Sequence, residues 1–383
     1  SCIVKGPTQE KIRRRIQELL KKDKRIILAG CMPRLNQKKL INLDNLYLLD
    51  TNHITDIINL IQDVNDNQYN PDRYINLRNE IKSNLPKISG ERFIGINQIS
   101  EGCMGECSYC IVKSVKGKLF SYPKEKIIES IKSDLQAGAK EIWITSQDNA
   151  NYGIDNGKYL LPELLKEIID FPGKFKIRLG MMNPNNVLKI LPELVELYKN
   201  EKVFKFLHLP IQSGSNRILK SMKRKYNKED VLKIIHEFKK QIQEITIATD
   251  IIVGFPGETD EDWKETINLI KEIKPEILNR SNFCVREGTE SERLIRLDSK
   301  LINQRATELM NLHLDICNEI QKPFLGKEIN VFVDKKGFGT TYLARDDNYK
   351  LVAIQSKEKI LGRFLKVKIK KVLAHYLIGE VVK

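Results

Sequence analysis

The chain has 383 residues, enough for two or three domains of the usual size of roughly 100 to 200 residues. Hydrophobic residues make up 41% of the chain and charged residues 30%. No uninterrupted apolar run approaches the roughly 18 residues of a membrane-spanning helix, so the pattern argues against a membrane protein. Neither a signal segment nor a transit peptide is visible, and the sequence therefore predicts a cytoplasmic enzyme.

The net charge of +15 is gathered at the two ends of the chain. Residues 1–40 hold 12 Lys and Arg against 3 Asp and Glu, and residues 322–383 hold 14 against 6. The stretch between them is close to neutral. A polyanion binds where Lys and Arg share one surface, so two basic ends predict such a partner. Two solvated basic faces without a partner are the alternative.

Residues 1–85 have the pattern of a small open α/β domain. A basic amphipathic helix is predicted over residues 8–22, followed by strands at residues 25–29 and 46–49. A polar stretch over residues 65–84 predicts a linker to the next domain.

Residues 90–300 alternate short apolar runs with longer amphipathic stretches. The predicted strands are 94–99, 142–145, 175–179, 204–209, 245–253 and 280–285. Segments with helical spacing lie between them, among them 125–136, 162–169 and 231–242. This alternation predicts parallel strands with right-handed crossovers. Six units are too few for a closed eight-unit barrel, so we expect a partial (β/α)6 barrel with its chemistry at the carboxyl ends of the strands.

The C-terminal part has a different pattern. A connecting helix over residues 301–321 ends before Pro323, and short alternating strands follow at 328–333, 341–344, 351–354 and 364–369. They predict a small all-β barrel over residues 322–383. Phe338, Tyr342 and Tyr349 are candidates for stacking on bases, with a place in the barrel core as the alternative.

The seven cysteines do not suggest a disulfide framework, because their number is odd and no secretion signal is visible. Cys103, Cys107 and Cys110 follow the first barrel strand at a spacing that can hold one metal centre. Sulfur ligands favour zinc or an iron–sulfur cluster. A structural zinc site needs a fourth ligand, and none follows nearby. Three thiolates on a four-iron cluster leave one iron open to another ligand.

The loop over residues 101–110, with Tyr109 directly before the third cysteine, resembles that of radical S-adenosylmethionine (SAM) enzymes. In that superfamily the open iron chelates SAM, and one electron cleaves SAM to a 5′-deoxyadenosyl radical. Polar segments with glycines follow four further strands, at 145–153, 178–184, 208–216 and 249–259. Together these segments resemble the methylthiotransferase branch of the superfamily over essentially the whole chain. For any single segment, an ordinary turn or helix cap is the alternative.

The resemblance implies the roles of individual residues. Cys103, Cys107 and Cys110 would hold the catalytic [4Fe–4S] cluster. The implied SAM contacts are Tyr109, Gln147, Asn183, Gln212 and Val253. Asp250 is expected to be structural.

The family also carries an auxiliary [4Fe–4S] cluster, held by three cysteines of its N-terminal domain. Cys2 and Cys31 match the second and third of these ligands. The first is expected upstream of Ser1, so the chain is expected to begin after its true start. Ordinary removal of an initiator methionine is the other explanation for that first residue. Cys284 and Cys317 match no family ligand and are expected to be small buried side chains.

The last 62 residues resemble a TRAM domain, a small β-barrel that binds tRNA in this family. The implied reaction adds a methylthio group at C2 of a modified adenosine at position 37, next to the tRNA anticodon. SAM would be both the methyl donor and the source of the radical. The expected partners are the tRNA anticodon loop, a reductant and a sulfur donor, and no membrane.

Three substrates compete within the family. Residues 2–11 and 180–184 resemble the archaeal and eukaryotic branch, which acts on N6-threonylcarbamoyladenosine. The isopentenyladenosine enzyme is the second candidate. The ribosomal-protein aspartate enzyme is the third, because its C-terminal module is expected to be less basic. A non-catalytic iron–sulfur RNA-binding protein is the alternative of another class, and the intact cysteine triplet argues against it.

Overall fold

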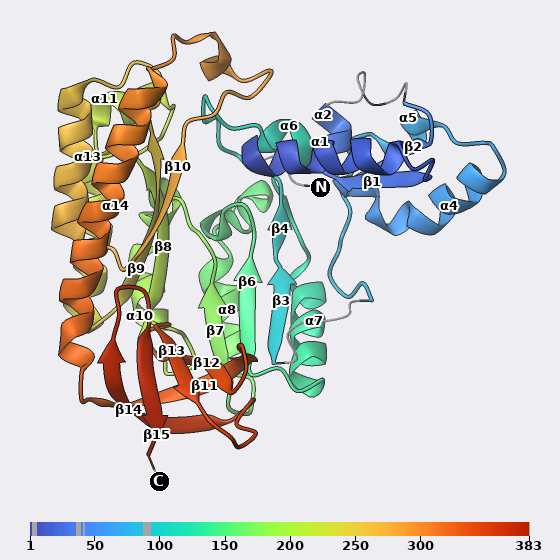
Figure 1. Cartoon of the computed structure of the whole chain (residues 1–383). Coiled ribbons are helices and arrows are strands. Elements are labelled where there is room, and N and C mark those ends of the chain that lie inside the picture. The colour runs from blue at the N-terminus through green and yellow to red at the C-terminus, as the bar shows by residue number, and fades with distance from the viewer. Residues whose placement is uncertain (2–5, 36–39, 41–42, 87–92, 383) are drawn as a thin grey trace. The chain divides into compact units, whose positions relative to one another are not determined.

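The computed structural model describes the chain apart from residues 2–5, 36–39, 41–42, 87–92 and 383 (Figure 1). The chain forms two compact units. Unit 1 consists of Ser1–Lys82, Glu101–Phe120 and Cys284–Glu292, and unit 2 of Ser83–Ser100, Ser121–Phe283 and Arg293–Lys383. The cysteine loop thus belongs to the same unit as the N-terminal residues. The domain boundaries near residues 85–90, 300 and 322 stay a prediction. None of the described helices is both long and apolar enough to cross a membrane.

Unit 1 contains a two-stranded parallel sheet, β1 (Ile26–Gly30) and β2 (Leu46–Asp50), close to the two predicted strands. Its helices are α1 (Gly6–Leu20), α2 (Met32–Leu35), η1 (Thr51–Asp56), α4 (Ile57–Asn65), α5 (Pro71–Tyr74) and α6 (Val112–Lys116), followed by η4 (Glu290–Arg293). Ile12, Ile16 and Leu20 of α1 recur every four residues and share one apolar cluster with the sheet. This stripe explains why a strongly basic segment forms a packed helix.

Unit 2 contains six parallel strands arranged as two three-stranded sheets, β3-β6-β7 and β8-β9-β10. Their bounds are β3 (Ile94–Gln98), β6 (Glu141–Thr145), β7 (Lys176–Leu179), β8 (Phe206–Gln212), β9 (Thr246–Val253) and β10 (Ile277–Asn282). A parallel bridge from Ile177 to Val203 and the bond from Met182 N to His208 O, 3.0 Å, connect the two sheets. The predicted partial (β/α)6 barrel is confirmed.

Helices cover the outer side of these sheets. The main ones are α7 (Lys124–Gln136), α8 (Leu161–Ile169), α10 (Leu191–Tyr198), α12 (Lys228–Gln241), α13 (Asp260–Ile273) and α14 (Ser299–Gln321). Shorter elements are η2 (Asn149–Asn151), η3 (Ile154–Asn156), α9 (Pro184–Val187), α11 (Asn216–Ser221) and η5 (Lys322–Phe324), and β4 (Ser100–Glu101) pairs with β5 (Phe120–Ser121). Figure 1 shows α13 and α14 side by side next to β8–β10. Capping boxes formed by Asn227 with Asp230 and Thr259 with Asp262 begin α12 and α13.

The last barrel strand begins and ends three residues before the predicted 280–285. β10 pairs with β9 from Ile277 to Asn282, and β9 itself ends at Val253, before a left-handed turn at Gly254 with a φ of +76°. Exposed Asn279 and Arg280 conceal the start of the strand in the sequence. Cys284 consequently lies beyond the sheet and is exposed, which corrects the expectation of a buried side chain, whereas Cys317 is buried as expected.

The C-terminal residues form a closed five-stranded barrel, as predicted. The strand order is β11 (Glu328–Lys336), β12 (Thr341–Asp346), β13 (Leu351–Gln355), β15 (Leu377–Val381) and β14 (Phe364–Val372). The sequence did not predict β15, because Gly379 interrupts its apolar pattern. A Cβ at Gly379 would lie 3.3 Å from atoms of Val352 and Val367, so this glycine lets the barrel close.

Two of the three aromatic residues proposed to stack on bases lie in the interior instead. Tyr342 is 5% exposed in the barrel core, and Tyr349 is 6% exposed in a cluster with Phe204 and Phe206 at the amino ends of the parallel strands. The alternative of a place in the barrel core therefore holds for Tyr342, whereas Tyr349 is buried against the parallel strands. Phe338, in contrast, is 98% exposed in the turn between β11 and β12.

Candidate active site

The cysteine loop in unit 1 turns around Gly105. Gly105 N lies 3.2 Å from the Cys103 sulfur, and Cys110 N donates to Cys107 O at 3.0 Å. A Cβ at Gly105 would stand 3.2 Å from the Cys103 sulfur and 3.7 Å from the Cys107 sulfur. Both sulfurs therefore border the space that glycine leaves open, and a side chain at residue 105 would fill it.

The base of the loop is fixed by a buried carboxylate. Glu101 is 3% exposed and receives Lys82 at 2.6 Å and Lys116 at 2.5 Å. The next residue, Gly102, has a φ of +79°, and a Cβ there would stand 2.0 Å from Lys118 O. The loop therefore starts from a conformation that glycine alone permits, held by two lysines on one carboxylate.

The cysteine loop supplies three thiols, the ligand type that both zinc and iron–sulfur clusters take. In the part of the chain that the structure describes, no three Cys, His, Asp or Glu side chains are gathered closely enough to hold one ion. The Cys103 and Cys107 sulfurs border the small open space at Gly105, and thiolates are the ligands that iron–sulfur clusters take.

Cys31 directly follows β1, where the backbone of Gly30 and Cys31 lies close to the backbone of Ser1. Cys31 N donates to Ser1 O at 3.1 Å, and Met32 N donates to Ser1 Oγ at 3.1 Å. Gly30 has a φ of +110°, and a Cβ there would stand 2.7 Å from Ser1 O. Cys2 lies outside the described residues. Its sequence neighbour Ser1, however, is hydrogen-bonded to the segment that carries Cys31.

In unit 2, Asp148 joins the polar segments that follow β6 and β7. Its carboxylate is 2% exposed and accepts from Asn183 N at 3.0 Å, Asn183 Nδ2 at 2.8 Å and Asn186 Nδ2 at 2.7 Å. Burial raises the pKa of this carboxyl, and the bonds from Asn183 act in the opposite direction. Two segments that the sequence places 35 residues apart are thus fixed by one carboxylate.

Gln147 and Asn149, on the same side of the barrel, carry unsatisfied acceptors. The side-chain oxygens of both are buried and have no hydrogen-bond partner among the described residues. A Cβ at Gly180 would stand 2.7 Å from Asn149 Nδ2, so glycine permits the close approach of the two segments. Buried acceptors without donors are rare in folded proteins, and a bound ligand with N–H or O–H groups would satisfy them.

Gln212 ends β8 in a backbone conformation that is uncommon for a residue with a side chain. Its φ is +74°, directly after a register shift between Leu209 and Gln212. Two residues later, a Cβ at Gly214 would stand 2.5 Å from Thr266 Cα. Ser215 caps α11 by accepting from Ile218 N, so the alternative of an ordinary helix cap holds for Ser215. Helix capping does not explain the positive φ of Gln212.

Arg224 belongs to the same hydrogen-bond network, although it was not among the predicted SAM contacts. Its Nη2 donates to Asn183 Oδ1 and, at 3.3 Å, to Pro210 O, and its Nε donates to Tyr226 Oη at 2.9 Å. It thereby connects the segments after β7 and β8. A left-handed residue at Lys223 turns the chain to bring Arg224 into place, and such a turn cannot be identified from the sequence.

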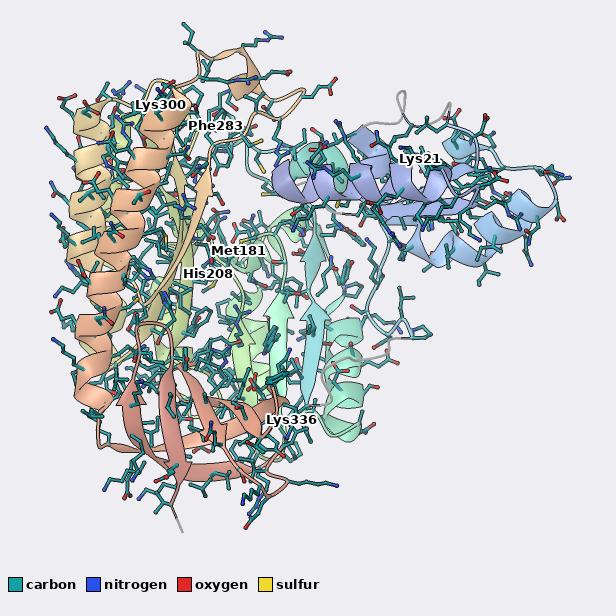
Figure 2. The ribbon with its side chains drawn as sticks, in the orientation of Figure 1. Lys21, Met181, His208, Phe283, Lys300 and Lys336 are labelled. Atoms are coloured by element: carbon teal, nitrogen blue, oxygen red, sulfur yellow. The ribbon has the colours of Figure 1, made fainter. Side chains whose placement is uncertain are left out.

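The remaining expected residues lie apart from this network. Val253 is fully buried and its carbonyl accepts from Phe283 N at 2.8 Å, so the structure leaves its side chain in the core. Tyr109 is half-buried in unit 1. Asp250 on β9 bonds to His208 Nε2 on β8 at 2.7 Å inside the barrel, and Figure 2 shows His208 close to Met181.

Comparisons with known proteins agree with this architecture. Residues 97–270 match the Radical SAM superfamily, and residues 322–382 match the TRAM domain. The fold is similar to that of the cobalamin-dependent S-adenosylmethionine radical enzyme OxsB in its apo, selenomethionine-labelled form. That match has a TM-score of 0.51 and 12% identity, and it covers 80% of this chain and 46% of the other. The structure of OxsB with aqua-cobalamin and S-adenosylmethionine bound gives a TM-score of 0.50 and 11% identity over the same shares. The radical SAM fold is therefore confirmed.

Curated relatives match along almost the whole chain. The probable threonylcarbamoyladenosine tRNA methylthiotransferase of Archaeoglobus fulgidus is 38% identical over 99% of this chain and 88% of that protein. The protein of the same name from Pyrococcus horikoshii is 38% identical over 100% and 89%. The threonylcarbamoyladenosine tRNA methylthiotransferase of Danio rerio is 31% identical over 99% and 70%. The chain belongs to this family of radical SAM methylthiotransferases, as the sequence motifs predicted.

Proposed function

We propose that this enzyme adds a methylthio group to C2 of N6-threonylcarbamoyladenosine at position 37, next to the tRNA anticodon. The observation that carries the proposal is full-length identity of up to 38% to relatives named for this modification. The same chain includes a radical SAM region and a TRAM domain. Neither an aromatic C–H bond nor a sulfur insertion is within the reach of side-chain chemistry alone, which is why cofactors are required.

Cys103, Cys107 and Cys110 are the proposed ligands of the catalytic [4Fe–4S] cluster. When bound, such a cluster supplies an open iron for SAM and the electron that cleaves it. The protein keeps the space between the Cys103 and Cys107 sulfurs open at Gly105 and fixes the start of the loop through Glu101.

SAM binding is assigned to Tyr109, Gln147, Asn183, Gln212 and Val253, and to Arg224 as an addition from the structure. The unsatisfied oxygen of Gln147 supports an acceptor role toward the amino or hydroxyl groups of SAM. The side chain of Asn183 is already oriented by Asp148 and Arg224. Val253 is proposed to contribute through its backbone, because its side chain is buried.

An auxiliary [4Fe–4S] cluster with Cys2 and Cys31 among its ligands is the second part of the proposal. The bond between Cys31 N and Ser1 O supports it, because Ser1 precedes Cys2. In the anaerobically reconstituted enzyme, Cys31→Ala should lower iron and sulfide content by the amount of one cluster and preserve cleavage of SAM. Unchanged iron content would contradict the assignment.

The C-terminal barrel is proposed to bind the tRNA. Residues 322–383 hold 14 Lys and Arg against 6 Asp and Glu. Exposed Phe338 follows Lys336 in the turn after β11, and Figure 2 labels Lys336 on this barrel. A basic surface with an exposed aromatic ring suits a nucleic acid, since phosphates pair with lysines and bases stack on rings.

The test is turnover by the anaerobically reconstituted enzyme on three tRNAs, with 2-methylthio products counted by mass spectrometry. We expect product on tRNA that carries threonylcarbamoyladenosine, and little product on tRNA with isopentenyladenosine or unmodified adenosine. Cys107→Ala is the matched control and should abolish both product and 5′-deoxyadenosine. Preference for the isopentenyl tRNA, or activity on a ribosomal protein alone, would overturn the substrate assignment.

A further inference from the structure

A cavity of about 480 Å³ opens in unit 1 between helix α1 and the segment that follows β10. Gln9 and Arg13 of α1 form one side, and Cys284 and Arg286 form another. The helix and the segment approach closely at Gly6, where a Cβ would stand 2.9 Å from the Cys284 sulfur. The cavity is large enough for a small polar organic group.

The wall of this cavity contains residues from all three segments that carry proposed cluster ligands. Gly6 follows Cys2 by four residues, Leu35 follows Cys31 by four residues, and Ile111 is the residue directly after Cys110. A group held in the cavity is therefore bordered by the segments on which the chemistry is proposed to take place.

The arginine that follows β10 is held in a defined position. Arg286 Nη1 donates to Gln9 Oε1 at 3.0 Å. Its carbonyl oxygen accepts from Thr289 N at 3.1 Å and from Thr289 Oγ1 at 2.7 Å, and Gly288 completes the turn with a φ of +83°. A fixed guanidinium loses less entropy when it binds an anion than a mobile one would.

The charges that face the cavity favour a group with one carboxylate and several hydrogen-bond donors. Two arginines, Arg13 and Arg286, and two glutamates, Glu10 and Glu287, line the cavity. Glu10 lies 3.7 Å from Arg14, which offsets its charge. An anion can therefore pair with the arginines, while Gln9 and the carboxylates can accept from N–H or O–H groups.

We infer that this cavity binds the threonylcarbamoyl group of the substrate nucleotide, with its carboxylate between Arg13 and Arg286. The assignment rests on the proposed function. The threonyl carboxylate matches the guanidiniums, and the urea N–H and the hydroxyl match Gln9 and Glu10. The threonyl methyl group matches apolar side chains such as Leu35, Ile111 and Val285, which also line the cavity.

The same lining disfavours an isopentenyl group. That group has no polar atom, so it would displace water from Arg13, Arg286 and Gln9 and give no hydrogen bond in return. A site built to hydrogen-bond a substrate rejects an analogue that lacks the matching groups. The cavity thus accounts for the choice between two modified adenosines.

The test combines a change in the enzyme with a change in the substrate. The wild type and the Arg13→Gln, Arg286→Gln double variant are each given anticodon stem-loops with threonylcarbamoyladenosine or with its methyl ester, which lacks the charge. In the wild type we expect the ester to lower kcat/KM by roughly 10- to 100-fold, the usual range for a lost charged hydrogen bond. The double variant should lose a similar factor on the acid and little more on the ester.

Arg15→Gln is the matched control, because Arg15 lies on the same helix, is 65% exposed and pairs with Glu18. This variant should keep the wild-type ratio of kcat/KM on the acid to kcat/KM on the ester. If the double variant is unstable, Arg13→Gln alone, a change at an exposed helix position, should lower the ratio of kcat/KM on the acid to kcat/KM on the ester to a smaller extent. A wild-type ratio of acid to ester in the Arg13 and Arg286 variants would overturn the cavity assignment alone. Absence of turnover on threonylcarbamoyladenosine by the wild type would overturn the proposed function and this assignment with it.

Discussion

The two ends of the parallel strands in unit 2 differ in how their buried groups are covered. At the amino ends, Tyr349 from the C-terminal barrel packs against Phe204 and Phe206 with centroid distances of 5.0 and 4.9 Å. At the carboxyl ends, the buried oxygens of Gln147 and Asn149 have no partner among the described residues. Among the described residues, Glu141 Oε1 and Thr246 Oγ1 at the amino ends also lack a hydrogen-bond partner, so the two ends differ in the aromatic cover of the amino ends. The acceptors at the carboxyl ends are the ones that a ligand can occupy.

The amino end also buries charge, but there aromatic rings cover it. The Arg178 guanidinium lies 4.9 Å from the Trp143 ring, 4.8 Å from Phe206 and 5.1 Å from Tyr349. Burial raises the pKa of the neighbouring Glu141 to about 7, with Asp334 as a second cause. The comparison therefore predicts that changes at the amino end alter stability and its pH dependence, and that changes at the carboxyl end alter ligand binding.

The largest expected effect is on stability at the amino end. Tyr349→Ala removes a side chain that is 6% exposed and touches three aromatic rings of the parallel strands. Removal of a large buried ring costs about 3–5 kcal/mol. Denaturant unfolding measures this loss. At temperatures where the variant is folded, SAM binding should stay within a factor of a few of wild type, and a selective loss of SAM binding would contradict the separation of the two ends.

At the carboxyl end, Asp148→Asn replaces an acceptor of three amide bonds with a side chain that also donates. Asn183 and Asn186 then lose their orientation. We expect formation of 5′-deoxyadenosine to fall roughly 100-fold, consistent with about 1.5–3 kcal/mol for hydrogen bonds to a charged group. Glu141→Gln, a carboxylate-to-amide change at the opposite end, is the control and should preserve SAM cleavage. Equal losses in both variants would show that the ends are not separate.

Glu141 should make stability depend on pH. Its folded-state pKa of about 7 lies above the ordinary value of 4.5, so the folded protein favours the protonated carboxyl. That contribution is fully present below about pH 4.5 and is lost as the pH rises through about 7, with an upper limit of about 3 kcal/mol. Unfolding midpoints of wild type should therefore decline over this range relative to Glu141→Gln. Glu129→Gln, an exposed change on α7, is the control, and parallel profiles for wild type and Glu141→Gln would contradict the assignment.

The smallest effect concerns backbone strain at Gln212. Glycine adopts a φ of +74° without steric cost, so Gln212→Gly should leave the free energy of unfolding unchanged or raise it by up to about 1 kcal/mol. If the side chain of Gln212 contacts SAM, affinity for SAM should nevertheless fall. Calorimetric titration with SAM and thermal unfolding separate the two effects. A variant that is destabilised and binds SAM normally would assign Gln212 a structural role instead.

The sequence predicted the order of elements well because each element has its own periodicity. The stripe of Ile12, Ile16 and Leu20 and the six apolar runs are local patterns, and the structure contains all of them. β15 was missed because Gly379 interrupts its apolar pattern, and the close approach of distant Val352 and Val367 to this glycine is not visible in any local pattern.

The site was predictable to the extent that its residues follow strands. Asp148 and Asn183 stand after β6 and β7, so the rule that parallel strands end at one edge places them together. The contacts of Arg224 and the cavity at Arg286 were not predicted, because each depends on a turn and on partners far away in the sequence. Tyr349 was misassigned for the same reason, since its burial results from contact with another domain.

The proposed activity of the chain is methylthiolation of threonylcarbamoyladenosine in tRNA. The most direct measurement is mass spectrometry of tRNA nucleosides from cells that lack the gene, complemented with wild type or with Cys107→Ala. We predict that the 2-methylthio derivative disappears, that threonylcarbamoyladenosine itself accumulates, and that the wild type but not the variant restores the product. An unchanged level of the 2-methylthio derivative in the deletion strain, or restoration by Cys107→Ala, would contradict the claim.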